Sequence, residues 1–358
     1  MSTWMYAWGI LISGLIYLGL FLGGLWTWSF VVLIFVLLPL LELIFPAPKD
    51  TLSEADYQKR SEKQWQYDIW LYLAVPLQYG LLFTYLWQVS KGDLQGWTYI
   101  GMSLSVAIAC GGYGINVAHE LGHRTQKMPR FASLMLLLTA LYMHFYIEHN
   151  KGHHAKIATP EDPASARKEE SLYAFWWRSV TQSWLSAWEI ESSALARKHV
   201  HIFSPKNLML QLIFVQISFI AMILFIFGIQ AMFSFIGVAV LGFLLLETVN
   251  YIEHYGLARK KKENDKGYER VLPMHSWNSN HLLGRIFLFD LPRHSDHHAH
   301  SKRPYSTLRH FDDSPQLPTG YLGMILLAFF PPVFKRVMHQ QLDREMQRLN
   351  HQTASISS

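Results

Sequence analysis

The chain has 358 residues, of which 51% are hydrophobic and 16% are charged, and its formal net charge is +5 at pH 7. This length suits one large domain or two ordinary ones. The single cysteine, Cys110, excludes a disulfide within the chain and also a four-cysteine iron site. Basic residues flank long apolar runs, which is typical of membrane topology rather than of nucleic-acid binding, so we expect no nucleic-acid partner.

Apolar residues gather into six runs, each long enough to cross a bilayer as a helix that rises 1.5 Å per residue. The runs are residues 4–22, 25–45, 69–88, 97–117, 208–227 and 229–252. Short links pair them into three hairpins. No Lys or Arg precedes the first run, which indicates an uncleaved anchor rather than a signal peptide. The sequence therefore predicts an all-α membrane protein with six transmembrane helices and a helical cap.

These runs divide the chain into four predicted parts. Residues 1–117 hold the first four spans and residues 207–252 the last two, while residues 118–206 and 253–358 form the cap. Of the 31 Lys and Arg residues, only Lys91 lies in a link on the side opposite the cap. The positive-inside tendency therefore places both termini and the cap in the cytoplasm.

One further apolar run, residues 131–147, is too short to be an obvious span and contains His144. It joins two histidine-rich segments, which must lie on the same side of the membrane if they share a metal site. We therefore expect a buried or re-entrant helix that begins and ends on the cytoplasmic side. The alternative is an ordinary seventh span.

Histidines cluster in four short segments, and the last of them holds four histidines within residues 294–300. Residues three or four apart lie on one face of a helix, so imidazoles at these spacings can converge on one point. Neutral imidazole is the commonest side-chain ligand for transition metals. The predicted metal ligands are His119, His123, His149, His153, His154, His254, His294, His297 and His298.

Nine imidazoles are too many for one metal ion, because common sites use three to six ligands. Two ions with four or five imidazoles each leave a position open for dioxygen or a substrate. Ligand type favours iron, with zinc and copper as alternatives. A surface tag or a pH-sensing cluster would explain one histidine-rich segment, but it would not explain four.

Metal-bound imidazoles are usually oriented by a hydrogen bond from the second ring nitrogen to a carboxylate or a carbonyl group. An ionisable residue near the end of an apolar span is also a functional candidate. Candidates for such supporting roles, each of which can instead be an ordinary carboxylate or amide, are Glu120, Glu148, Glu253, Asp296, Glu161, Asp162, Glu247 and Asn250.

The segment from His119 to His123 also matches the H-E-x-x-H signature of zinc proteases, with Glu120 as the general base. A protease would use two of the histidines and one further ligand, and it would leave the other segments without a role. A metal transporter is disfavoured because the histidines lie on one side rather than along a path across the membrane.

The histidine segments resemble the signatures of the integral-membrane alkane monooxygenases, and the resemblance extends from about residue 118 to residue 300. The matching stretches are HELGH at 119–123, EHNKGHH at 148–154, NYIEHYGL at 250–257, SWNSN at 276–280 and RHSDHH at 293–298. The HYG element at 254–256, together with the three residues before the paired histidines of the second segment, distinguishes this family from the related membrane fatty-acid desaturases.

The resemblance implies that two iron ions form a non-haem centre, which inserts one oxygen atom of O2 into the terminal methyl group of an alkane. It also implies a separate rubredoxin, with its rubredoxin reductase, as the electron donor, and a location in the bacterial inner membrane. Basic residues at 259–262 and 302–303 can attract an acidic carrier or contact anionic lipid. The alternative on the same scaffold is a desaturase or epoxidase.

Overall fold

The computed structural model describes the backbone of residues 2–262 and 267–357, and helices dominate this part of the chain. Six helical segments are long and apolar enough to cross a membrane, which confirms the prediction of an all-α, multi-pass membrane protein. They are α1 (Thr3–Leu22), the broken segment Gly24–Ile44, α5 (Gln64–Lys91), the broken segment Gly96–Gly122, α12 (Leu208–Phe227) and α13 (Ile229–His254).

Two of the spans are not continuous α-helices but consist of several short helical segments. The second consists of η1 (Gly24–Trp28), α2 (Ser29–Val32), η2 (Leu33–Leu37) and α3 (Leu38–Ile44), and the fourth consists of α6 (Gly96–Ile108), η3 (Ala109–Ile115) and α7 (Asn116–Gly122). Both η2 and η3 are π-helical turns. Such turns insert one extra residue into an α-helix and are frequent at functional sites.

The fourth and sixth spans extend farther than their apolar runs predict. The fourth continues from residue 117 to Gly122, and the sixth continues from residue 252 to His254. Each extension stays helical as the sequence becomes polar, so His119 and His254 are carried on the ends of the same rigid helices that cross the membrane.

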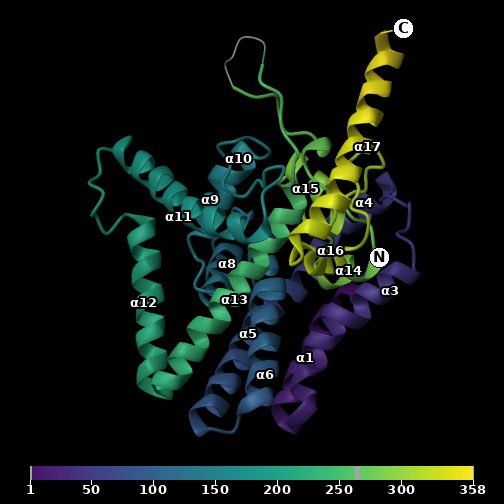
Figure 1. Ribbon diagram of the computed structural model, residues 1–358. Coiled ribbons are helices and arrows are strands. Elements are labelled where there is room, and N and C mark those ends of the chain that lie inside the picture. Colours follow the sequence, from purple (N-terminus) through teal and green to yellow (C-terminus); the bar gives the residue numbers. More distant parts are fainter. Residues whose placement is uncertain (1, 263–266, 358) are drawn as a thin grey trace.

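The three hairpin turns lie together at one end of the molecule, and the histidine-bearing elements α10 and α15 lie at the other (Figure 1). The start of α1 and the C-terminal helix α17 are also at the end that holds the histidines. The elements of this cap are α4 (Glu54–Glu62), α8 (Lys127–Leu138), α9 (Phe145–Glu148), η4 (His149–His153), α10 (His154–Lys156), α11 (Leu172–Ala196), η5 (Pro273–His275), α14 (Leu282–Phe287), α15 (His294–Ala299), η6 (Tyr305–Thr307), α16 (Tyr321–Ala328) and α17 (Pro331–Ser357).

The apolar run at residues 131–147 is not the single helix that we predicted. It is shared between α8 and α9, and the chain turns between them, where Leu141 has a φ of 50°. Neither helix approaches the roughly 20 residues that a span requires. The segment also returns to its starting side, because the rings of His123 and His149, which flank it, are 5.2 Å apart.

A very close crossing joins the fourth and sixth spans within the π-helical turn η3. A Cβ atom on Gly111 would overlap the backbone carbonyl of Gly242, whereas the main chains fit when neither residue has a side chain. Small residues allow membrane helices to approach closely, and van der Waals packing is a major source of their association. This contact fixes α13, which ends at His254, against the helix that carries His119.

We expect Gly111→Ala to lower the free energy of unfolding by about 1–3 kcal/mol or more, because the added methyl group overpacks the crossing. The measurement is the unfolding midpoint in detergent. Gly237→Ala on α13 is the matched control, since its Cβ would meet no atom within 4 Å. Equal losses in the two variants would contradict the importance of this crossing.

Candidate metal centre

The four histidine segments, which are far apart in the chain, meet in the cap immediately beyond the membrane helices. His119 lies in α7 and His123 directly follows this helix, while His254 is the last residue of α13. The other six predicted ligands come from two short cap segments. These are His149, His153 and His154 of η4 and α10, and His294, His297 and His298 of α15.

Five of the nine imidazoles form one group whose potential ligand atoms all lie within 4.8 Å of one another. The members of this first group are His119, His123, His149, His154 and His297. The ring centroids of His119 and His149 are 4.3 Å apart, and Nε2 of His154 is 3.0 Å from Nε2 of His149. The group is large enough to surround one metal ion.

The other four imidazoles form a second group together with one carboxylate. Two sets of three ligand atoms, each within 4.8 Å, share His254: one adds His153 and His298, and the other adds Glu253 and His294. Nε2 of His294 is 2.6 Å from Nε2 of His298, so the two sets are continuous. The structure therefore gathers all nine predicted residues, five in one group and four in the other.

Adjacent histidines contribute to different groups. His153 belongs to the second group and His154 to the first, and in the same way His298 and His297 are divided. Successive residues in a helix point about 100° apart because a turn contains 3.6 residues, so paired histidines diverge towards two centres. Our expectation that the closely spaced imidazoles of each segment converge on one point was wrong for these pairs.

Both groups contain buried ring nitrogens without hydrogen-bond partners. Among the described residues, Nε2 has no partner in His119, His123, His153 and His297, and neither ring nitrogen of His254 has one. Buried polar atoms are nearly always satisfied, so each exception needs an explanation. A metal ion at each group would satisfy one nitrogen of each of these rings, and the residues therefore fit metal ions.

The protonation state of most of the imidazoles also suits metal binding. The exception is His153: burial lowers its pKa, but the charge of Asp162 and the hydrogen bond to it outweigh burial and raise the pKa above its usual value. Burial, followed by repulsion between neighbouring imidazoles, holds the pKa of His149, His294, His297 and His298 well below the usual range. The same causes lower the pKa of His154 to about 3. These rings are therefore neutral at physiological pH, which is the form that binds a metal.

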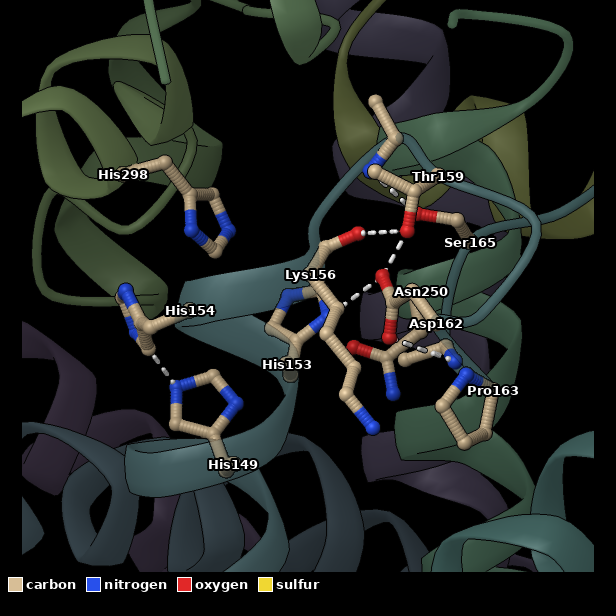
Figure 2. Close-up of polar contacts among 12 residues, drawn as sticks. His149, His153, His154, Lys156, Thr159, Asp162, Pro163, Ser165, Asn250 and His298 are labelled. Atoms are coloured by element: carbon tan, nitrogen blue, oxygen red, sulfur yellow. Dashed lines mark hydrogen bonds and ion pairs between the residues drawn. The ribbon is translucent and has the colours of Figure 1, made fainter. Parts of the chain in front are cut away.

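Asp162 orients His153, as Figure 2 shows. Nδ1 of His153 donates to Oδ2 of Asp162 over 2.9 Å, and Oγ of Ser165 donates to the same oxygen over 2.6 Å. The backbone N–H of Ala164 donates to Oδ1. Burial opposes ionisation of Asp162, but the hydrogen bonds and the charge of His153 outweigh burial and hold the pKa of Asp162 below its usual value. This pair has the form of a ligand with its orienting carboxylate.

The other predicted supporting residues have different surroundings. Glu120 forms an ion pair with Arg124 at 2.6 Å, and Glu161 is exposed. Asp296, although it lies inside a histidine segment, binds His300, Arg303 and the backbone N–H of Arg309. Sequence position alone did not distinguish these carboxylates from Asp162.

Glu148, Glu247 and Asn250 are buried close to the two metal groups. Among the described residues, none of the three forms a hydrogen bond with one of the nine imidazoles. Glu247 accepts from Tyr142 at 2.8 Å and from Ser179 at 2.5 Å, and Asn250 is 3.4 Å from it. Burial, together with repulsion from Asp162, raises the pKa of Glu148 to about 8.

The fourth histidine segment is anchored by Arg293, which is fully buried. Its Nε donates to Oδ1 of Asn280 over 3.0 Å, and its Nη1 donates to the carbonyl of Leu308 over 2.7 Å. The amide of Asn280 donates in turn to the carbonyl of Pro48. These bonds tie α15 to the chain that leaves the second span, and they explain why the SWNSN stretch accompanies the histidines.

A narrow apolar cavity leads from the imidazoles into the membrane helices. His119, His149 and His294 form one wall together with Glu253. The remaining lining is mostly hydrophobic and comes from the second, fourth and sixth spans and from the cap, and it includes Ile34, Phe35, Ile108, Leu245, Val249, Phe287, Leu291, Leu322 and Ile325. No sequence pattern predicts this lining, because its residues are ordinary apolar residues from distant segments.

A second apolar groove, nearer the outside of the bundle, shares part of this lining. Phe35, Ile108 and Leu245 line both spaces, and the groove continues over Leu241, Leu244 and Trp176. The three shared residues therefore separate the metal-side cavity from the outer, hydrophobic face of the helices.

Comparison with known proteins gives the class first. The family model of the fatty acid desaturases matches residues 95–328, which include all four histidine segments. Within that class, alkane 1-monooxygenase 2 of Pseudomonas aeruginosa is 40% identical over 314 residues, or 87% of this chain and 83% of that protein. Alkane 1-monooxygenase 1 of Alcanivorax borkumensis is 38% identical over 331 residues, covering 91% and 81% of the two chains.

The chain therefore belongs to the alkane 1-monooxygenase family of membrane proteins, and the resemblance found in its histidine segments is confirmed. A more distant relative is the hydroxylase component of xylene/toluene monooxygenase from Pseudomonas putida, which is 25% identical over 320 residues, or 88% of this chain and 82% of that protein.

We expect Asp162→Asn to weaken metal binding by about 10–100-fold, because loss of an orienting carboxylate lets the ligand ring turn. Metal affinity is measured by competition with a chromophoric chelator. Glu161→Gln, a change of the same kind at the adjacent exposed carboxylate, is the control and should bind as the unmodified protein does. Similar affinities in the two variants would contradict the role of Asp162.

Proposed function

We propose that this protein is a membrane monooxygenase that hydroxylates the terminal methyl group of alkanes to give primary alcohols. The observation that carries the proposal is a double group of imidazoles that forms the end wall of an apolar cavity between membrane helices. Membership of a family whose relatives are named alkane 1-monooxygenase supports it.

The proposed cofactor is a pair of iron ions held by the nine histidines, five at one ion and four at the other. The neutral rings and the unpartnered ring nitrogens support this assignment. Bound there, the iron pair would supply the activation of dioxygen. The protein's own part is to hold the rings in place, as Asp162 does for His153.

Substrate recognition must work without polar contacts, because an alkane has none to offer. The apolar lining of the cavity would bind the chain by hydrophobic contact and exclude water from the wall formed by His119, His149 and His294. The narrow cavity would admit an unbranched chain end-on, so that a terminal methyl group reaches this wall first.

The reaction balances with one O2, two electrons and two protons. One oxygen atom replaces the hydrogen of a terminal C–H bond as hydroxyl, and the other leaves as water. The chain contains one cysteine, Cys110, which is buried, so we propose that the electrons come from a separate rubredoxin and its reductase.

We further propose that the protein lies in the bacterial inner membrane with its cap and both termini in the cytoplasm. The distribution of basic residues supports this orientation, because Lys91 alone of the 31 lies in the turns at the opposite end. Rubredoxin would then reach the metal groups through the cap, while the alkane would come from the bilayer.

The proposed activity can be tested with protein purified in detergent and supplied with O2, rubredoxin, rubredoxin reductase and NADH. We expect a linear alkane to yield the 1-alcohol, with one atom of oxygen-18 incorporated from labelled dioxygen. Removal of the metal by a chelator should abolish the product, and ferrous iron should restore it. An alkene as the main product would favour a desaturase and contradict the proposal.

We propose that the alkane passes from the outer groove into the metal-side cavity beside Leu245, which lines both spaces. We therefore expect Leu245→Trp to lower kcat/KM for long alkanes at least about tenfold, because the larger side chain would block this passage. Val240→Trp, on the lipid-exposed side of the same helix, is the control. Metal content should be unchanged in both. Equal activity of the two variants would contradict this route for the substrate.

A further inference from the structure

Glu253 differs from the other buried carboxylates because it lies within a metal group rather than behind it. It is the penultimate residue of α13, is 1% exposed and directly precedes His254. Its Oε2 is 3.0 Å from Nε2 of His294, and the potential ligand atoms of Glu253, His254 and His294 all lie within 4.8 Å of one another.

We propose that Glu253 is a direct ligand of the metal ion in the second group. That ion would be held by one carboxylate and the four imidazoles of His153, His254, His294 and His298, whereas the ion in the first group would be held by imidazoles alone. The inference rests on the proposed di-metal function and adds a tenth protein ligand to it.

The spacing of the ligand atoms supports coordination. Two ligand atoms about 2.1 Å from a metal and at a right angle are about 3.0 Å apart. This is the separation of Glu253 Oε2 from His294 Nε2, and also that of His149 Nε2 from His154 Nε2 in the first group. The carboxylate therefore occupies the position that a neighbouring imidazole would occupy.

The contrast with Asp162 separates a ligand from an orienting residue. Both oxygens of Asp162 accept hydrogen bonds from the protein, and its partner His153 keeps Nε2 free for a metal. Glu253 instead faces Nε2 of His294, and its own Oε1 has no hydrogen-bond partner among the described residues. A hydrogen bond to His294 would occupy Nε2 and leave Oε1 unsatisfied.

The hydroxyl of Tyr321 offers a support for the bound carboxylate. Tyr321 is fully buried, and its hydroxyl interacts with the carboxylate of Glu253. In the proposed site Tyr321 would donate to one oxygen of the carboxylate while Oε2 faces the metal. This is the usual arrangement for a ligating carboxylate, which is itself hydrogen-bonded.

A carboxylate ligand would make the two ions chemically different. It would add a negative charge and a hard oxygen to the second ion, and mixed imidazole and carboxylate ligands are the set found at non-haem ferrous sites. Glu253 and His294 also line the substrate cavity. The charged ligand would therefore lie on the side of the centre that faces the alkane.

The test is a titration of metal-free, full-length protein with Co²⁺, in which the visible spectrum and the amount bound are followed together. We expect the unmodified protein to bind two equivalents. Glu253→Gln keeps the size of the side chain and an oxygen that accepts from His294, but it removes the charge. It should bind the first equivalent normally and the second at least about 10–100-fold more weakly, with a changed second spectrum.

Glu247→Gln is the matched control, because Glu247 is equally buried on the same helix and bonds to Tyr142 and Ser179. It should bind two equivalents with the original spectra. Two tight equivalents with unchanged spectra in Glu253→Gln would overturn the inference, as would fewer than two in the unmodified protein. If Glu253→Gln does not fold, Glu253→Asp decides, since a shortened ligand must alter the second spectrum.

The outcome is separable from that of the proposed reaction. Unmodified protein that binds two ions through Glu253 but yields no alcohol would refute alkane hydroxylation and leave the ligand assignment intact. Alcohol formation by the unmodified protein, together with an unaltered second Co²⁺ site in Glu253→Gln, would support alkane hydroxylation and refute the ligand assignment.

Discussion

The structure depends on the burial of unpartnered imidazole nitrogens at two adjacent points. A buried polar atom without a partner costs about 1–3 kcal/mol, and His119, His123, His153, His254 and His297 each offer an unpartnered ring nitrogen to the two groups. Metal ions bound by these nitrogens would offset that cost at both groups. The rest of the fold can be understood as the means of bringing these rings together.

Two kinds of support hold the rings. His119 and His254 are on the extended ends of membrane helices, which the tight Gly111–Gly242 crossing fixes against each other. The short cap segments have no such length to stabilise them and rely on buried hydrogen bonds. His153 is oriented by Asp162, and α15 is held by Arg293 through Asn280. The membrane part thus sets the distance between segments, and polar contacts set the direction of single rings.

Sequence patterns predicted the spans, and they selected the nine histidines that the structure brings together, because both signals are local. A run of apolar residues can be counted, and imidazoles at short spacings are rare by chance. The assignment of each histidine to one of the two metal groups is not a local property. Whether His153 and His154 belong to the same group depends on the π-helical turn that precedes His154 and on the residues packed against that turn. The break between α8 and α9 was missed for a related reason, since apolar composition does not record where a buried chain turns.

The carboxylates were the least predictable part of the centre. Asp296 and Glu253 both lie inside histidine segments, yet Asp296 turns outward to Arg303 while Glu253 turns inward to His294. Asp162 is eight residues beyond its nearest histidine in sequence, His154, and becomes a partner of His153 only because the intervening chain folds back. The direction of a side chain is a tertiary property, and spacing alone cannot supply it.

Charge gives a reason for so many acids around neutral rings. Glu148, Asp162 and Glu253 are each at most 2% exposed, and buried carboxylates are costly unless cations compensate them. Two divalent ions bound to neutral imidazoles would bring four positive charges into the same volume. Burying these charges without nearby anions would carry a similar free-energy cost. The carboxylates and the metal ions would thus each offset the free-energy cost of burying the other. The raised pKa of Glu148 follows from burial and from repulsion by Asp162 without such ions, so metal binding at the centre should be accompanied by proton release from Glu148.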